Sequence, residues 1–190
     1  YFFNYNDSNN LFQDNILIAP LGIVSSTISS YSSYINNTIS ASQSAIFAEN
    51  CANCVFDGNI ISGIQGSNNN QVSNGISIVD FDDDDWWCMS HSGVNPEDIY
   101  SSDMHIVNNT ITSAYSGISL DAYYNSHYIS NNHITGSLYN GGITVNQSSE
   151  ISFNHIERTI GADNGDFINA HNSHIHKLTH RQKLAHPHAH

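Results

Sequence analysis

One short pattern of apolar and polar positions recurs along the chain and predicts its strands. Each copy has an apolar residue, two polar residues that usually end in Asn, a variable residue and Ile. A second phrase of Gly or Ala followed by alternating apolar residues lies between these copies. Alternation with a period of two indicates β-strands and not helices. The first phrase reads FQDNIL, YINNTI, VFDGNI, IVNNTI, ISNNHI and ISFNHI, and the second reads GIV, AIF, GISI, GISL and GITV.

The spacing of these phrases predicts a solenoid. The fourth positions of the first phrase are separated by steps of 22, 21, 51, 23 and 22 residues, and they are Asn15, Asn37, Gly58, Asn109, Asn132 and Asn154. Strands this short bury an apolar face only when successive coils stack. We therefore expect Ile118 to stack on Ile143, and Ile111 on Ile134. The repeated Asn is interpreted as scaffold, because Asn tolerates the left-handed corner conformation and stacked amides can hydrogen-bond between coils.

The repeats resemble those of the pectin-lyase-like superfamily over about residues 10–178. The resemblance implies an all-β fold, a right-handed parallel β-helix solenoid with about 22 residues per coil and one long inserted loop. It divides the chain into a β-helix domain at 1–178 and a His-rich tail at 179–190. Members of this superfamily include polysaccharide lyases, glycoside hydrolases, epimerases, phage tailspikes, adhesins and copper-system proteins, so the fold does not specify an activity. The NTD, GHG and RIK motifs of the pectin-hydrolysing branch are missing.

The long step contains an insert at residues 80–103, which holds eight of the chain's 17 acidic residues and the stretch FDDDDWW. Aromatic faces suit stacking on sugar rings, and carboxylates can accept hydroxyl hydrogen bonds, transfer protons or bind Ca²⁺. The alternative is a purely structural role, in which the insert is a solvated loop held against the coil by packing of its two Trp side chains. The candidate residues are Asp82, Asp83, Asp84 and Asp121 for catalysis, Trp86, Trp87, Tyr123 and His91 for substrate binding, and Asp80, Asp82 and Asp84 for Ca²⁺.

Charge narrows the choice of partner. Residues 1–157 contain no Lys or Arg and 15 Asp and Glu, so we expect neither nucleic acid binding nor membrane insertion. A lyase acting on acidic sugars needs cationic side chains to neutralise its substrate, which favours a neutral glycan. If the protein is an enzyme, a carboxylate-dependent glycoside hydrolase fits better than a lyase.

Histidines and cysteines offer further chemistry. Seven of the 12 histidines lie in the last 20 residues, and neutral imidazoles at His186, His188 and His190 are candidate transition-metal ligands. A flexible tail that captures metal adventitiously is the alternative, and no cofactor is required. Three cysteines cannot all pair within one chain. One of Cys51, Cys54 and Cys88 is therefore either free or paired outside the chain. Cys51 and Cys54 fit buried thiols, a local disulfide, a metal half-site or a redox pair.

Two function classes remain open. The first is an extracellular, secreted protein that binds or processes a neutral glycan in a groove beside residues 80–103. The second is a structural or adhesive surface protein without enzymatic activity. Residues 1–10 show no capping helix, so we also expect stacking on another chain or on a missing N-terminal region. Sequons at Asn6, Asn36, Asn108 and Asn146 permit glycosylation in a eukaryotic source.

Overall fold

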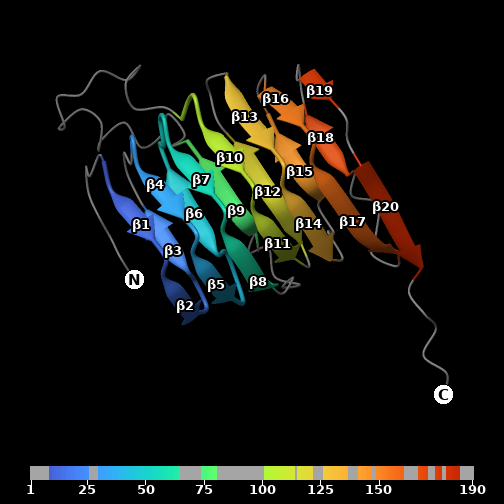
Figure 1. Ribbon diagram of the computed structural model, residues 1–190, viewed down its shortest axis with the longest axis horizontal. Helices are drawn as coiled ribbons and strands as arrows, with labels where there is room; N and C mark the ends of the chain where they lie inside the picture. The colour runs from blue at the N-terminus through green and yellow to red at the C-terminus, as the bar shows by residue number, and fades with distance from the viewer. Residues whose placement is uncertain are drawn as a thin grey trace.

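The protein is described by a computed structural model, in which residues 9–25, 30–64, 74–80, 101–113, 115–121, 126–136, 141–146, 149–160, 167–170, 174–176 and 179–184 are placed. These residues form strands and connecting turns and no helix. The strands form three parallel sheets that the chain visits in turn, as expected of a parallel β-helix. Successive coils stack along the long axis from the N-terminal to the C-terminal end (Figure 1).

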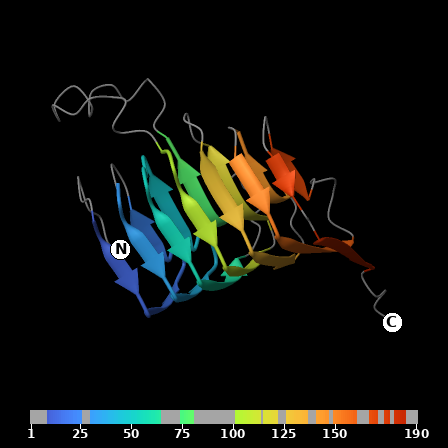
Figure 2. The ribbon, with the colours of Figure 1, turned by 45° about the horizontal axis from the view of Figure 1, so that its top comes forward.

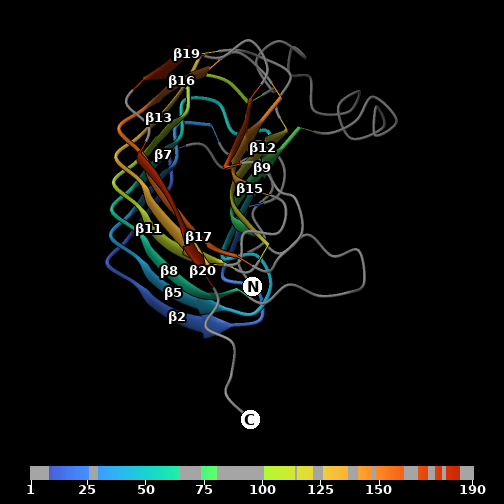
Figure 3. The same ribbon diagram turned by 90° about the vertical axis from the view of Figure 1, so that its right-hand side faces the viewer.

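The first two sheets hold seven strands each and the third holds six. Seen end-on, the sheets surround one interior (Figure 3). Sheet A contains β1 (Leu11–Gln13), β4 (Ser33–Ile35), β7 (Val55–Asp57), β10 (His105–Val107), β13 (His127–Ser130), β16 (Ser149–Ser152) and β19 (His174–His176). Sheet B contains β2 (Ile16–Ala19), β5 (Thr38–Ala41), β8 (Ile60–Ile64), β11 (Thr110–Ser113), β14 (His133–Gly136), β17 (His155–Ile160) and β20 (Thr179–Leu184). Sheet C contains β3 (Ile23–Ser25), β6 (Ile46–Glu49), β9 (Asn74–Val79), β12 (Ser116–Asp121), β15 (Gly141–Val145) and β18 (Ile168–Ala170).

The strand register follows the sequence repeat. Ile118 pairs with Ile143 in sheet C, and Ile111 pairs with Ile134 in sheet B, so both predicted stacks are confirmed. All four isoleucine side chains are fully buried, and the residue that follows each of them on its strand faces outward. In sheet A the interior column begins with the stacked rings of Phe12, Tyr34 and Phe56 and continues as isoleucines. The strands of this column lie side by side in chain order (Figure 2).

A ladder of asparagines joins the coils at the corner between sheets A and B. The Nδ2 of each ladder residue donates to the Oδ1 of the next, at 2.9–3.0 Å. Each Oδ1 also accepts the backbone N–H of the preceding ladder residue, at 2.9–3.1 Å. Both polar ends of the buried amide are therefore hydrogen-bonded, as burial requires. The ladder consists of Asn15, Asn37, Asn59, Asn109, Asn132 and Asn154.

The third member corrects the sequence alignment, because the ladder uses Asn59 and not Gly58. Phe56, and not Val55, is the register partner of Tyr34, so the equivalent phrase in this coil begins at Phe56. Gly58 has a φ of 65° and occupies the left-handed corner one residue earlier. The sequence repeat predicts that one Asn has the left-handed conformation and also supplies the amide ladder. In the structure the first of two adjacent residues has the left-handed conformation, and the second supplies the ladder amide. The corner residues are Asp14, Asn36, Gly58, Asn108, Asn131 and Phe153.

The glycine of the second phrase allows sheets B and C to approach closely. A Cβ on Gly117 would lie 2.4 Å from Cγ2 of Ile134 and 2.6 Å from the backbone oxygen of Gly142. Gly75 and Gly142 meet Ile111 and Ile156 in the same way. Within the described residues, no helix is long and apolar enough to cross a membrane.

Candidate functional site

The structure describes both ends of the predicted insert. Asp80 follows β9, and the chain continues from Ser101 toward β10. Residues 81–100 lie outside the described residues, so the predictions for Asp82, Asp83, Asp84, Trp86, Trp87 and His91 are not tested. The same holds for Tyr123 and for His186, His188 and His190. Of the predicted site residues, only Asp80 and Asp121 are placed.

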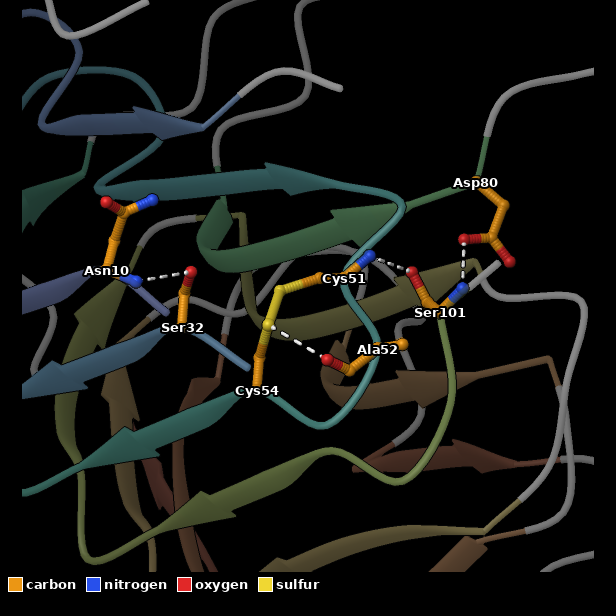
Figure 4. Close-up of a disulfide and its surroundings, with 7 residues drawn as sticks. All are labelled: Asn10, Ser32, Cys51, Ala52, Cys54, Asp80 and Ser101. Atoms are coloured by element: carbon orange, nitrogen blue, oxygen red, sulfur yellow. Dashed lines mark hydrogen bonds between the residues drawn. A yellow bond between two sulfur atoms is a disulfide. The ribbon is translucent and has the colours of Figure 1, made fainter. Parts of the chain in front are cut away.

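The two ends of the insert are tied together by Asp80. Its Oδ1 accepts a hydrogen bond from the backbone N–H of Ser101, with 2.8 Å between the two atoms (Figure 4). The Ser101 side chain is buried, and its Oγ accepts the backbone N–H of Cys51 at 2.9 Å. The backbone N–H of Asp80 donates to the carbonyl of Asp121 at 2.9 Å. The insert therefore leaves and re-enters the coil at one fixed point, to which we refer as the insert base (Asp80, Ser101).

A disulfide lies directly beside the insert base. Cys51 and Cys54 are bonded in the turn between β6 and β7, and both are fully buried (Figure 4). Asn50 precedes the turn and Asn53 lies within it, and both have left-handed conformations, with φ of 49° and 56°. The backbone N–H of Asn53 donates to the carbonyl of Ser102, so the turn supports the returning end of the insert. Of the alternatives that the sequence left open for Cys51 and Cys54, the structure contains the local disulfide. Cys88 is the remaining cysteine of the chain.

Replacing both Cys51 and Cys54 by Ala should lower the free energy of unfolding by about 2 kcal/mol, because the bond closes only a short loop of the unfolded chain. Urea denaturation followed by circular dichroism measures this loss.

Thiol reagents supplied with a reductant should not modify Cys51 or Cys54 until the protein unfolds, since both sulfurs are buried. Rapid labelling of either residue in the native protein would contradict this expectation.

Asp121 lies next to the insert base on the outer face of sheet C. It is exposed at the end of β12 and is the register partner of Val79, the residue before Asp80. Its Oδ1 accepts a hydrogen bond from Nδ2 of Asn146 in the neighbouring coil. Asp57 has a similar arrangement in sheet A, where its Oδ1 accepts from Nδ2 of Asn108 at 2.8 Å. The Asp121–Asn146 pair supplies a carboxylate and an amide to solvent beside the insert.

Apart from Asp121 and Glu49, the side chains on the outer face of sheet C are uncharged among the described residues. Ser119 and Thr144 are half-buried hydroxyl residues on adjacent strands, and Glu49 lies at the edge of the face. Phe47 is half-buried on β6, in register with Ser77. Hydroxyls and a carboxylate suit hydrogen bonding to an uncharged polar ligand, and an aromatic ring suits stacking against it. No basic side chain belongs to this face among the described residues.

Side chains that could ligate a metal meet on the opposite wall. His133, His155 and Glu157 in sheet B place one ligand atom each within 4.8 Å of one another, the one such group of three among the described residues. Sequence reasoning missed this group, although its signal is the His at the same position of two consecutive phrases, NNHI and FNHI. Ser101 was also missed, and nothing in the sequence distinguishes it from the other serines. Comparison of the chain with known protein families, curated proteins and solved structures gave no match.

Proposed function

We propose that the protein is a secreted, right-handed β-helix of the pectin-lyase-like class with about 22 residues per coil, and that it binds a neutral glycan beside the insert base. The observation that supports this most directly is the hydrogen bond from Ser101 to Asp80, which fixes both ends of the insert next to exposed Asp121. Loops held by a rigid scaffold commonly carry the binding residues of such folds. The handedness follows the general preference for right-handed crossovers between parallel strands.

The charge of the chain supports a neutral ligand. With no Lys or Arg in residues 1–157, the outer face of sheet C offers no cationic side chain to neutralise a uronate or a sulfate. Asp121, Asn146 and the neighbouring hydroxyls can hydrogen-bond to sugar hydroxyls. The Cys51–Cys54 disulfide is consistent with secretion, because disulfides persist in oxidising compartments.

Within this proposal the insert and Tyr123 supply the remaining contacts. Trp86 and Trp87 would stack on sugar rings, and Tyr123 and His91 would contribute further contacts to the glycan. Asp82, Asp83 or Asp84 would pair with Asp121 for glycoside hydrolysis, which needs two carboxyl groups about 5–9.5 Å apart. Ca²⁺ bound by Asp80, Asp82 and Asp84 would order the insert.

Glycan-array screening followed by titration calorimetry tests the binding proposal. We expect the wild type to bind a neutral polysaccharide and the Trp86→Ala/Trp87→Ala double variant to bind it at least tenfold more weakly. Asp121→Asn should weaken binding at least about tenfold, because a hydrogen bond to a charged group contributes about 1.5–3 kcal/mol. Asp57→Asn is the matched control, because it alters an equivalent Asp–Asn pair on sheet A, and should change affinity less than about twofold.

The rival proposal is a structural or adhesive protein whose solenoid is itself the function. The asparagine ladder favours it, because the ladder continues from Asn59 to Asn109 across the 50-residue separation with a hydrogen bond of 2.9 Å, as between Asn109 and Asn132. If the wild type binds no neutral glycan, or if Asp121→Asn and Asp57→Asn behave alike, the binding proposal is wrong and the structural one takes its place.

A further inference from the structure

His133 and His155 lie side by side on the outer face of sheet B. They are register partners on β14 and β17, and the next residue on each strand, Ile134 or Ile156, is buried in the core. Alternation along a strand therefore directs both imidazoles outward. Glu157 follows His155 by two residues and lies on the same outer face, in register with Thr135. The three side chains come from only two strands, so the backbone sets their spacing.

The geometry of the group suits a single ion. The ligand atoms of His133, His155 and Glu157 all lie within 4.8 Å of one another. The two rings meet edge to face, with centroids 4.8 Å apart and planes at 89°. His133 is exposed while His155 and Glu157 are half-buried, so the group is open to solvent on one side. An ion can enter without any opening of the coil.

The backbone beneath the two histidines is held by the asparagine ladder. His133 and His155 directly follow Asn132 and Asn154, which are joined by an Nδ2–Oδ1 hydrogen bond of 2.9 Å. The backbone N–H of His133 donates to the backbone carbonyl of Asn109, and that of His155 donates to the backbone carbonyl of Asn132, each at 2.8 Å. A rigid support of this kind pre-positions ligands and raises affinity by lowering the cost of ordering them.

We propose that His133, His155 and Glu157 form a binding site for a divalent transition-metal ion of the Zn²⁺ class. Two imidazoles and one carboxylate suit Zn²⁺ and its neighbours, whereas Ca²⁺ and Mg²⁺ prefer oxygen ligands alone. Three protein ligands leave the fourth tetrahedral position to a water molecule. The net charge of −13 favours the approach of a cation. The three ligands are different residues from His186, His188 and His190, and they belong to sheet B, whereas the glycan is proposed to bind at sheet C.

Zn²⁺ titration calorimetry and the visible absorption of bound Co²⁺ test the site in the full-length chain. The background carries His186→Ala, His188→Ala and His190→Ala, so that the tail does not mask the result. We expect one equivalent of Zn²⁺ to bind in this background. His133→Asn, His155→Asn and Glu157→Gln should each weaken Zn²⁺ binding at least tenfold and reduce the Co²⁺ bands, because each removes one ligand.

His105→Asn is the matched control, since His105 is an exposed histidine on the outer face of sheet A, and it should change Zn²⁺ affinity less than twofold. Circular dichroism should show that every variant keeps its β structure, because all these side chains lie outside the core. Loss of all Zn²⁺ binding in the tail-substituted background would overturn the proposal. Glu157 is also the register partner of Arg181. If Glu157→Gln left the affinity within twofold of wild type, Glu157 would serve that strand pair alone and the three-ligand site would be wrong.

Discussion

Replacing Asn109 by Asp should lower the free energy of unfolding by about 3–5 kcal/mol, because the side chain keeps its shape but loses its buried donor. In the wild type, Nδ2 of Asn109 donates to Oδ1 of Asn132 and to the carbonyl of Phe56, each at 2.9 Å. An ionised Asp would present a second acceptor to both of these oxygens. Urea denaturation followed by circular dichroism measures the loss.

Asn131→Asp is the matched control for this substitution. Asn131 is exposed at the left-handed corner, with a φ of 55°, and Asp14 occupies the equivalent corner in the first coil. The control should change the free energy of unfolding by less than about 0.5 kcal/mol. Equal losses for the two variants would show that the ladder contributes no more to stability than an exposed corner.

Replacing Gly117 by Ala should lower the free energy of unfolding by about 3 kcal/mol, at the upper end of the usual cost of overpacking. The added methyl group would lie 2.4 Å from Cγ2 of Ile134 and 2.6 Å from the backbone oxygen of Gly142. The second contact is with backbone, so a change of rotamer at Ile134 cannot relieve it. The midpoint of urea denaturation, measured at an unchanged slope, reports the loss.

Ser119→Ala on the same strand separates this effect from a general loss of strand stability. Ser119 faces outward and is half-buried, and its replacement should cost less than about 0.5 kcal/mol. Gly75→Ala should match Gly117→Ala, since its added Cβ would lie 2.4 Å from Cγ2 of Ile111. A Gly117→Ala protein as stable as the wild type would mean that sheets B and C do not approach as closely as described.

The repeat made the fold predictable, since period-two alternation and constant spacing specify which isoleucines stack. Ile118 with Ile143 follows from equivalent positions in GISL and GITV. The same approach failed at VFDGNI, because Val55 is apolar and looks like the start of the phrase, whereas Phe56 is the buried residue. Apolar character alone does not distinguish the two residues, but the distance to the next Asn does.

The candidate sites were less predictable for a physical reason. The insert has no repeat, so no equivalent position elsewhere in the chain indicates what its residues contact. The bond between Asp80 and Ser101 joins residues 21 apart in sequence, and an Asp–Ser pair carries no signal of its own. His133 and His155 could have been predicted as neighbours, because they occupy the same position in consecutive phrases and stacking brings such positions together.

The closed insert base makes the segment it bounds an exchangeable cassette. Asp80 and Ser101 meet through a single hydrogen bond, and the ladder spans the same interval from Asn59 to Asn109 with unchanged geometry. The cost of closing a loop grows slowly with length, by about 0.6 kcal/mol for each doubling. Segments of quite different length and composition can therefore be grafted between these two residues with the coils beneath them intact. Divergence of ligand preference in such a protein would be expected to occur inside the cassette, while the frame remains recognisable by its asparagines and glycines.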